Sequence, residues 1–301
     1  MRKDRLAWIA LLIVCFFWGT TYLAIRIGVQ VFPPFLFTGL RIFGGGIILM
    51  ILWLFQKNRT PIGSKIVLVN GIAGFLFFTL GIGMVGWAEQ VIPSGLAALL
   101  CSFPPIWLVL LNVFVFKVEK INATILLGIF LGFGGMILVF KEHIPDLLHP
   151  QYAIAVLVTI SANICWVIAS LYLKRSNPSG DSVLNAFIQM LSGGLFLLLF
   201  SFVFERNIHL VWSAPVIYSL LYLLVFGSVI TFWAYLYALS HLPITLVSLH
   251  NYINVLVAII LGSVILNEGL NPFIFISVLI TLLGIYFVHK GLQINKKAHN
   301  L

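Results

Sequence analysis

The sequence predicts an all-α integral membrane protein of ten transmembrane helices, arranged as two inverted five-helix repeats around a central cavity. Two observations lead to this fold class: the composition and an internal repeat. Of the 301 residues, 61% are hydrophobic and only 8% are charged. Soluble domains have about 25% charged residues, so a soluble fold could not bury this much apolar surface. A membrane is the environment that this composition requires.

Ten apolar segments follow one another with short connections, which leaves no room for a soluble domain. Each is long enough, or nearly so, to cross about 30 Å of hydrocarbon. Arg2, Lys3 and Arg5 precede the first segment, but no small-x-small cleavage site follows, so we expect a retained helix. The segments are Leu6–Gly28, Pro34–Phe55, Ile66–Trp87, Pro93–Phe116, Asn122–Phe140, Tyr152–Leu173, Ser182–Phe204, Ala214–Leu239, Ile244–Leu266 and Pro272–Val288.

The two halves of the chain repeat each other at a nearly constant spacing. Because five helices per half is an odd number, the second half must be inverted, which is typical of transporters with a midplane site. We expect a first repeat over 1–142, a second over 149–291, and a disordered basic tail over 292–301. The pairs 148 positions apart are Trp18 and Trp166, Arg26 and Lys174, Arg41 and Gln189, and Gly45-Gly46 and Gly193-Gly194. Pro93 and Pro243 lie 150 apart, and Glu119 and Glu268 lie 149 apart.

A proline pair interrupts the fourth segment. Pro104 and Pro105 cannot donate backbone hydrogen bonds, and they free the carbonyls one turn earlier, at Leu100 and Cys101. Carbonyls without partners are not tolerated against lipid. We therefore expect the break to face protein or a water-filled cavity.

The basic residues predict the orientation. With the N-terminus inside, 13 of the 17 Lys and Arg residues fall on the inner side, and the exceptions are Arg26, Arg41, Lys141 and Arg206. Positive charge gathers on the cytoplasmic side of membrane proteins. We expect a multi-pass protein of the cytoplasmic membrane with both termini inside. The net charge of +9 and pI near 9.6 follow from this arrangement and do not indicate nucleic-acid binding.

Two motifs resemble a known family. The stretch Trp18-Gly-Thr-Thr-Tyr22-Leu-Ala-Ile-Arg26-Ile-Gly28, followed by Gly39-Leu-Arg41, resembles the start of EamA-type transporters. The stretch Ala88-Glu-Gln-Val-Ile-Pro-Ser-Gly-Leu-Ala-Ala98 resembles their YedA/PecM-like branch, within the drug/metabolite transporter superfamily. The resemblance implies two inverted EamA repeats, a central cavity and export of small metabolites, often amino acids.

The sequence departs from the family pattern at two positions. Ile82 stands between two glycines where relatives often have Asn, and Val255 follows Asn254 where relatives often have Pro. The first departure removes a polar group from the expected cavity, and the second removes an expected kink in the ninth helix. The family's substrate therefore cannot be carried over to this chain.

The first and sixth segments predict two walls of a cavity. Trp18, Tyr22 and Arg26 form one helical stripe, and Asn163, Trp166, Ser170 and Lys174 form the matching one. Aromatic residues also gather at membrane interfaces, so an interface belt is the alternative. Arg26 and Lys174 fit surface anchors that snorkel to the headgroups better than they fit a site.

Arg41 is the most informative single residue. It lies seven residues inside the second segment, where a guanidinium costs at least about 2.5 kcal/mol at the helix centre. It could bind a substrate carboxylate, pair with Glu89, or reach the outer surface and snorkel. Its repeat counterpart, Gln189, is neutral, so a charge in the cavity would be one-sided.

The remaining candidates for substrate binding lie in the fourth, eighth and ninth segments. Polar groups at mid-span need protein or cavity partners, although hydrogen bonds between helices would satisfy them equally well. His250 could also act as a proton carrier, whereas the eighth-segment aromatics could simply be packing residues. These candidates are Ser102, Trp233, Tyr237, His250, Asn251 and Asn254.

Several function classes find no support in the sequence. Cys15, Cys101 and Cys165 lack metal-ligand spacing, and no catalytic constellation or cofactor motif is present, so we expect neither an enzyme nor a cofactor. No Asp or Glu lies at mid-depth in any segment, and Glu89 is the nearest. We expect a secondary transporter that exports a zwitterion or small organic acid with an apolar or aromatic group. A multidrug or cation exporter is one alternative, and a receptor or membrane-embedded enzyme is another.

The expected partners are the lipid bilayer and a small-molecule substrate. Gly128 and Gly132 form a small-xxx-small pair in the fifth segment, typical of close helix packing. We expect this pair to pack within the chain, although a dimer face is the alternative. The protein is thus expected to be a monomer or a homodimer.

Overall fold

The computed structural model describes the chain except residues 1, 58–59, 116–120, 143, 177–180, 207–209, 243–246, 248–249, 268–271 and 300–301. In these described residues the protein is helical and has no strand. Eight helices are long and apolar enough to cross a membrane, and Ala123–Leu138 and Ile253–Leu266 are shorter apolar helices. The predicted all-α membrane fold is confirmed, while the count of ten spanning helices stays a prediction.

In its described residues, the first half of the chain contains three continuous helices and two interrupted spans. Residues Ser64–Ala88 form one apolar span in which an α-helix, a π-helix and a short α-helix follow one another. The elements are α1 (Arg2–Val29), α2 (Pro34–Leu54), α3 (Ser64–Gly74), η1 (Phe75–Gly83), α4 (Met84–Ala88), α5 (Ser94–Leu100), α6 (Pro104–Leu110), η2 (Leu111–Val115) and α7 (Ala123–Glu142).

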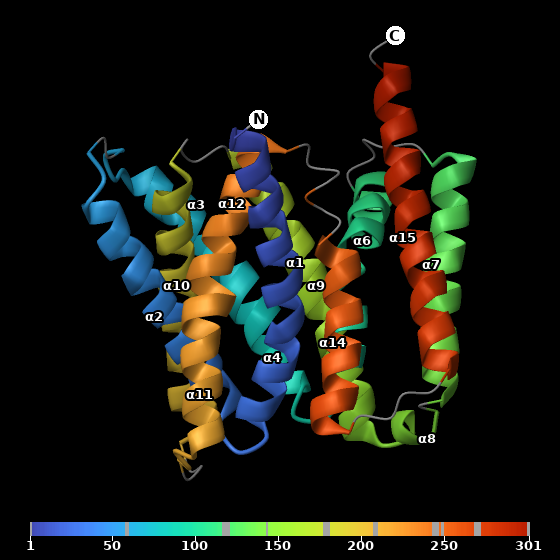
Figure 1. Ribbon diagram of the computed structural model, residues 1–301, viewed down its shortest axis with the longest axis horizontal. Coiled ribbons are helices and arrows are strands. Elements are labelled where there is room, and N and C mark those ends of the chain that lie inside the picture. Colours follow the sequence, from blue (N-terminus) through green and yellow to red (C-terminus); the bar gives the residue numbers. More distant parts are fainter. Residues whose placement is uncertain are drawn as a thin grey trace.

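The second half follows after α8 (Ile144–Leu147), a short helix that links the two halves. Its elements are α9 (Pro150–Ser176), α10 (Ser182–Phe204), α11 (Ala214–Tyr222), η3 (Leu223–Ile230), α12 (Thr231–His241), α14 (His250–Leu266) and α15 (Pro272–His299). The expectation of a disordered tail over 292–301 is wrong as far as His299, because α15 continues to that residue and extends beyond the other helices (Figure 1). No proline follows Gly291, and Leu, Gln and Lys are good helix formers.

The π-helical segments recur at matching places in the two halves. The first residues of η1 and η3, Phe75 and Leu223, lie 148 positions apart, which is the spacing of the sequence repeat. A π-helix has i→i+5 hydrogen bonds and is frequent at functional sites. The sequence does not predict these segments, and they change the face that the following residues present.

Matching helices of the two halves pack against each other in antiparallel directions. A Cβ added at Gly46 of α2 would lie 2.9 Å from the backbone nitrogen of Leu191 in α10, and one at Gly194 would lie 2.6 Å from that of Phe43. The second contact is the repeat equivalent of the first, because Gly194 lies 148 positions after Gly46 and Leu191 lies 148 positions after Phe43. The two helices are therefore related by a local two-fold axis, and their backbones approach too closely for a side chain at either glycine.

The pair α7 and α15 repeats this arrangement with a shift of 149 positions. A Cβ at Gly135 would lie 2.7 Å from the backbone nitrogen of Thr281, and one at Gly284 would lie 2.7 Å from Gly132 Cα. Asn122, just before α7, donates to the Gly291 carbonyl (2.8 Å), so these helices also run antiparallel. Gly128 and Gly132 thus pack within the chain, as expected. Helices α7 and α15 lie next to each other at one side of the bundle (Figure 1).

Two carboxylates complete the ends of α2 and α10. Asp181 is the N-cap of α10 and accepts from the backbone nitrogens of Val183 and Leu184 (3.0 Å each). Glu205, at the other end of α10, accepts from the nitrogens of Phe35 (2.9 Å) and Leu36 (3.0 Å) in α2. Helix N-termini have unpaired donors and positive partial charge, so both carboxylates stabilise them.

The ends of the helices define two sides of the bundle. α1 begins and α15 ends on the same side (Figure 1). Because α7 and α15 are antiparallel, Ala123 at the start of α7 lies on this side as well. Pro272, which opens α15 six residues after the end of α14, lies on the opposite side.

The outer surface of the bundle is apolar, as contact with lipid requires. Large hydrophobic side chains are exposed along its length, including Phe130, Ile137, Phe202 and Val264. Soluble monomers rarely expose apolar surface on this scale. The buried polar residues, among them Arg41, Asn70, Glu89 and Asn163, are inside the bundle.

The close contact of α7 and α15 yields a stability prediction. We expect Gly284→Ala to destabilise the purified protein by roughly 1–3 kcal/mol, because the added methyl overlaps the α7 backbone. The measurement is thermal unfolding in detergent. Gly134→Ala is the matched control, since a Cβ there meets nothing within 4 Å. Equal stability of the two variants would contradict the observed packing.

Candidate functional site

The stripe on α1 connects three parts of the interior. Trp18 contacts rings from α12 and α14, Tyr22 hydrogen-bonds with the thiol of Cys101, and Arg26 donates to the backbone oxygen of Glu89. The three side chains of the predicted stripe are thus partly buried and contact other helices of the bundle. Arg26 contacts the end of α4 through this hydrogen bond, and its role as an anchor that snorkels to the headgroups stays a prediction.

Three rings form a cluster in the interior, called here the aromatic cluster: Trp18, Tyr235 and His250. The centroid of Trp18 lies 5.1 Å from Tyr235 and 5.0 Å from His250, and Tyr235 lies 5.8 Å from His250. These separations are typical of favourable edge and tilted ring contacts. The cluster joins α1, α12 and α14 through uncharged surfaces.

Hydrogen bonds orient the α14 side of the aromatic cluster. His250 Nδ1 lies 2.7 Å from the Val247 carbonyl oxygen and donates to it, which leaves Nε2 as an acceptor in the neutral ring. With its amide nitrogen toward the carbonyls, Asn254 donates to His250 O (3.0 Å) and Cys15 O (2.8 Å). Asn254 therefore ties α14 to α1, and α14 continues as one helix past Val255.

Arg41 lies at the centre of a second cluster. Its side chain is 4% exposed, so the alternative that it snorkels to the surface is wrong. Its Nε donates to Ser228 Oγ (3.2 Å), and Glu89 and Tyr22 act on it electrostatically. One terminal guanidinium nitrogen is buried and has no acceptor among the described residues. We call Tyr22, Arg41, Glu89 and Ser228 the charged cluster.

Glu89 contributes the negative charge of this cluster. It follows directly after α4, and its side chain is 0% exposed. The sequence predicted that no Asp or Glu lies at mid-depth in a span and that Glu89, the nearest, lies near a helix end, and the structure places Glu89 at the end of α4. The sequence did not show that this helix end is buried, which follows from the packing of α1 and α2 against α4.

The proline break lies next to the charged cluster. Helix α5 ends at Leu100, α6 begins at Pro104, and Phe103 between them is completely buried. The break therefore faces protein, as the sequence predicted. Asn163 donates to Cys101 Sγ (3.7 Å) and to the Thr159 carbonyl (2.8 Å), which brings α9 to the break. Ser102 donates to Leu99 O (2.7 Å), within its own turn.

Gln189 does not reach the charged cluster, although it is the repeat counterpart of Arg41. Its Nε2 donates to Asn70 Oδ1 (2.8 Å), and Asn70 Nδ2 donates to Asn185 Oδ1 (2.9 Å). This amide network joins α3 to α10. The structure therefore gives Gln189 a role in helix packing, and its placement in a substrate cavity is not supported.

The other predicted aromatics lie outside both clusters. Trp166 packs against Phe77 (4.6 Å between centroids), Tyr237 stacks on His241 (4.2 Å), and Trp233 is 57% exposed. Tyr235 lies two residues from each of Trp233 and Tyr237, about 200° around the helix. Tyr235 occupies the inner face that we expected Trp233 and Tyr237 to occupy. Asn251 is in α14, and its side chain lies outside the described part of the chain.

Sequence reasoning missed Tyr235, Ser228 and Cys101. A usable signal existed for Ser228, because it lies 149 positions after Thr79 on the matching π-helix. Thr79 donates to the Gly193 carbonyl (2.9 Å), whereas Ser228 accepts from Arg41. The repeat therefore places hydroxyls at equivalent sites and gives only one of them to the charged cluster.

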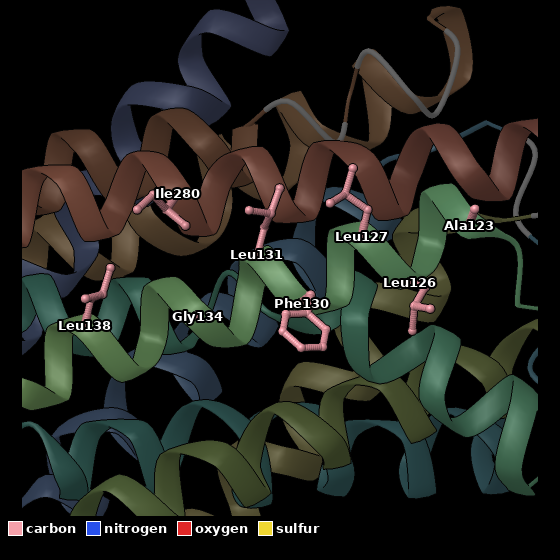
Figure 2. Close-up of a pocket in the computed structure, with 8 residues that line it drawn as sticks. All are labelled: Ala123, Leu126, Leu127, Phe130, Leu131, Gly134, Leu138 and Ile280. Atoms are coloured by element: carbon pink, nitrogen blue, oxygen red, sulfur yellow. The ribbon is translucent and has the colours of Figure 1, made fainter.

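One groove lies on the outside of the bundle, along α7 and α15. Figure 2 shows its apolar lining: Ala123, Leu126, Leu127, Phe130, Leu131, Gly134, Leu138 and Ile280. It has no polar group that could orient a metabolite, and its residues belong to the lipid-facing surface. In the part of the chain that the structure describes, no three His, Cys, Asp or Glu residues come together as metal ligands.

These features define a class: a membrane protein with a buried charged cluster and a neighbouring aromatic cluster between two sets of packed helices. The sequence profile of the EamA-like transporter family matches residues 5–141 and 153–289. The chain therefore belongs to the EamA-like transporter family and is a membrane transporter.

Relatives agree with this assignment. The chain is 29% identical to the uncharacterized inner membrane transporter YedA of Escherichia coli, over 94% of this chain and 90% of YedA. It is 26% identical to the uncharacterized transporter YoaV of Bacillus subtilis, over 91% and 93% of the two chains. One solved crystal structure shares the fold with a TM-score of 0.62 at 19% identity, covering 95% of this chain and 96% of the other.

The amide network yields a prediction that separates packing from binding. We expect Gln189→Leu to lower the free energy of unfolding by about 0.5–2 kcal/mol, because it leaves the buried Asn70 amide oxygen without its donor. Thermal unfolding in detergent measures this loss. Ligand selectivity should not change, and a changed selectivity would show that Gln189 belongs to the site.

Proposed function

We propose that this transporter exports a small metabolite that has a carboxylate and an apolar or aromatic group. The observation behind the proposal is the terminal nitrogen of Arg41, which is buried without an acceptor among the described residues. An unpaired buried donor of a charged group is costly. A substrate carboxylate would satisfy it, because the guanidinium fork matches a carboxylate in geometry and charge.

The aromatic cluster would receive the apolar part of the substrate. Trp18 and Tyr22 are one turn apart on α1, about 6 Å along the helix axis. Trp18 belongs to the aromatic cluster and Tyr22 to the charged cluster, so the two clusters adjoin along this helix. A ligand with its carboxylate at Arg41 and a ring or alkyl group about 6 Å away would contact both.

Alternating access between inverted repeats would move the substrate. The proposed repeats are residues 1–142 and 149–291, with the charged and aromatic clusters between their helices. The two-fold relation of α2 with α10 and of α7 with α15 supports this mechanism, because inverted repeats can exchange conformations about a fixed site. The excess of Lys and Arg on the side where α1 begins supports cytoplasmic termini.

A cation exporter is the second candidate, and the buried carboxylate of Glu89 is the observation that favours it. Carboxylates attract cations, and aromatic rings accept them on their faces. However, Arg41 acts on Glu89 within the same cluster, and its positive charge would repel a permanent cation. A substrate with a carboxylate is therefore the better fit.

The role of Arg41 can be tested in reconstituted liposomes. We expect Arg41→Gln to reduce transport of a carboxylate substrate at least about tenfold, and transport of its uncharged amide analogue much less. Arg206→Gln is the matched control, because Arg206 is exposed at the end of α10. Equal losses for both substrates would make Arg41 structural. A quaternary cation as the best wild-type substrate would refute the proposal.

The inverted topology can be tested by labelling. Glu119 and Glu268 occupy matching repeat positions and lie outside the described residues. Single cysteines at these positions, in a chain whose three native cysteines are replaced, should react with a membrane-impermeant maleimide from opposite sides. Position 119 should label from the cytoplasm and position 268 from outside. Labelling of both from one side would contradict the inverted repeat.

A further inference from the structure

We infer that the outer groove along α7 and α15 binds an anionic phospholipid, with an acyl chain in the groove and the phosphate at Lys290. The groove has no residue in common with the charged cluster or the aromatic cluster. The ligand is a lipid of the surrounding bilayer and not the transported substrate, so the inference does not depend on the proposed function.

The groove has the size and the lining that an acyl chain requires. Its volume is about 650 Å³, and its lining consists of Ala, Leu, Ile, Phe and Gly residues (Figure 2). It follows one face of α7 from Ala123 to Leu138, which is about 22 Å of helix. A Cβ at Gly134 would meet nothing within 4 Å, so the missing side chain deepens the groove. Since one leaflet of hydrocarbon is about 15 Å thick, a chain that enters at Ala123 stays within the groove.

One end of the groove lies beside the point where α15 extends out of the bundle. A Cβ at Gly291 would lie 2.9 Å from the backbone nitrogen of Ile125, so Gly291 is level with the first turn of α7, where the groove begins at Ala123. Asn122 donates to the Gly291 carbonyl and to Asn295 Oδ1 (2.8 Å each). These bonds fix α15 to α7 at this level, so the protruding end of α15 has a defined position next to the groove (Figure 1).

The face of α15 that borders the groove changes from apolar to basic at this level. Ile280 lines the groove, and the exposed side chains of Leu283 and Tyr286 follow it at intervals of three residues. Lys290 comes four residues after Tyr286 and is exposed as well. A lysine in this position covers apolar surface with its methylene groups and keeps its ammonium among the headgroups. Lys297 follows two helical turns further along α15.

The charge at this end favours an anionic headgroup over a zwitterionic one. Helix α15 contains three lysines and no Asp or Glu, and the one carboxylate of α7, Glu142, is at the other end of that helix. Just before α7 in the sequence, Glu119 lies between Lys117 and Lys120. A zwitterionic lipid compensates its own phosphate, whereas an anionic lipid supplies the negative charge that basic residues near a membrane surface attract.

A second copy of this chain would fit the groove less well than a lipid. Two copies in one membrane have the same orientation, so a two-fold axis between them is perpendicular to the bilayer and places equal ends side by side. The lysines of both α15 helices would then lie close together, with no carboxylate in α15 to compensate them. Like charges across an interface oppose association.

Native mass spectrometry of the full chain in a neutral detergent measures this binding. The probes are phosphatidylglycerol and phosphatidylcholine with identical acyl chains, and glycerol 3-phosphate without any chain. We expect the wild-type protein to bind the first phosphatidylglycerol at least about fivefold more tightly than the first phosphatidylcholine, which is the effect of one basic residue near a lipid surface. Glycerol 3-phosphate should not bind measurably, because it has no group that fills the groove.

Two variants separate the headgroup from the acyl chain. Lys290→Gln should bring the ratio of the two affinities close to one. Gly134→Leu fills the groove, so it should weaken both lipids at least about fivefold and leave their ratio unchanged. Lys65→Gln is the matched control, because Lys65 is exposed in the first turn of α3, at the other edge of the bundle from α7 and α15 (Figure 1). It should change neither affinity, and all three variants should keep the wild-type melting temperature.

Each contrary result overturns the inference in its own way. Equal wild-type affinity for the two lipids would show that the headgroup charge is not recognised. A preference that survives both Lys290→Gln and Gly134→Leu would place the anionic lipid elsewhere. Equal losses of preference in Lys290→Gln and Lys65→Gln would reduce it to the overall positive charge. A dimer that Gly134→Leu dissociates would assign the groove to a second copy. None of these outcomes bears on transport, which the liposome test of Arg41→Gln decides separately.

Discussion

The burial of the Arg41 guanidinium is the constraint around which this structure is arranged. A cation within a membrane span is costly, and it persists only where protein groups replace its water. Here the groups come from three other helices: Ser228 from η3, Glu89 from the end of α4, and Tyr22 from α1. Those helices must meet at α2, and their meeting forms the charged cluster beside the proline break.

Close backbone contacts make that meeting possible. In lipid, helices gain little from the hydrophobic effect when they associate, so packing at small residues and hydrogen bonds between helices hold the bundle together. Gly46 and Gly194 bring α2 against α10, and Gly135 and Gly284 bring α7 against α15. The amide network of Asn70, Asn185 and Gln189 adds polar contacts between α3 and α10.

The two halves are related by symmetry, but the site is not symmetric. Thr79 and Ser228 are matching hydroxyls, yet Thr79 bonds a backbone carbonyl and Ser228 bonds Arg41. Likewise, Arg41 lies in the charged cluster whereas Gln189 packs between helices. Equivalent positions in the two halves can therefore carry different residues, and these differences give the site one defined orientation. Such a site suits a ligand with two different ends.

Much of the architecture could be predicted from the sequence, because hydropathy and spacing follow from the chain alone. The membrane class, the helical stripe of Trp18, Tyr22 and Arg26, the break before Pro104 and the intramolecular use of Gly128 and Gly132 all required only local patterns. The burial cost of Arg41 was readable in the same way, since a charge deep in an apolar segment is visible without coordinates.

The tertiary structure decided which partners those residues found. Tyr235 contacts Trp18 of α1, whereas Trp233 is exposed, and η3 directly before α12 changes the face that these residues present. The burial of Glu89 depends on α1 and α2 closing over the end of α4, and the use of Gln189 depends on Asn70 lying opposite it. Such contacts join residues far apart in the chain, and only the packed bundle brings them together.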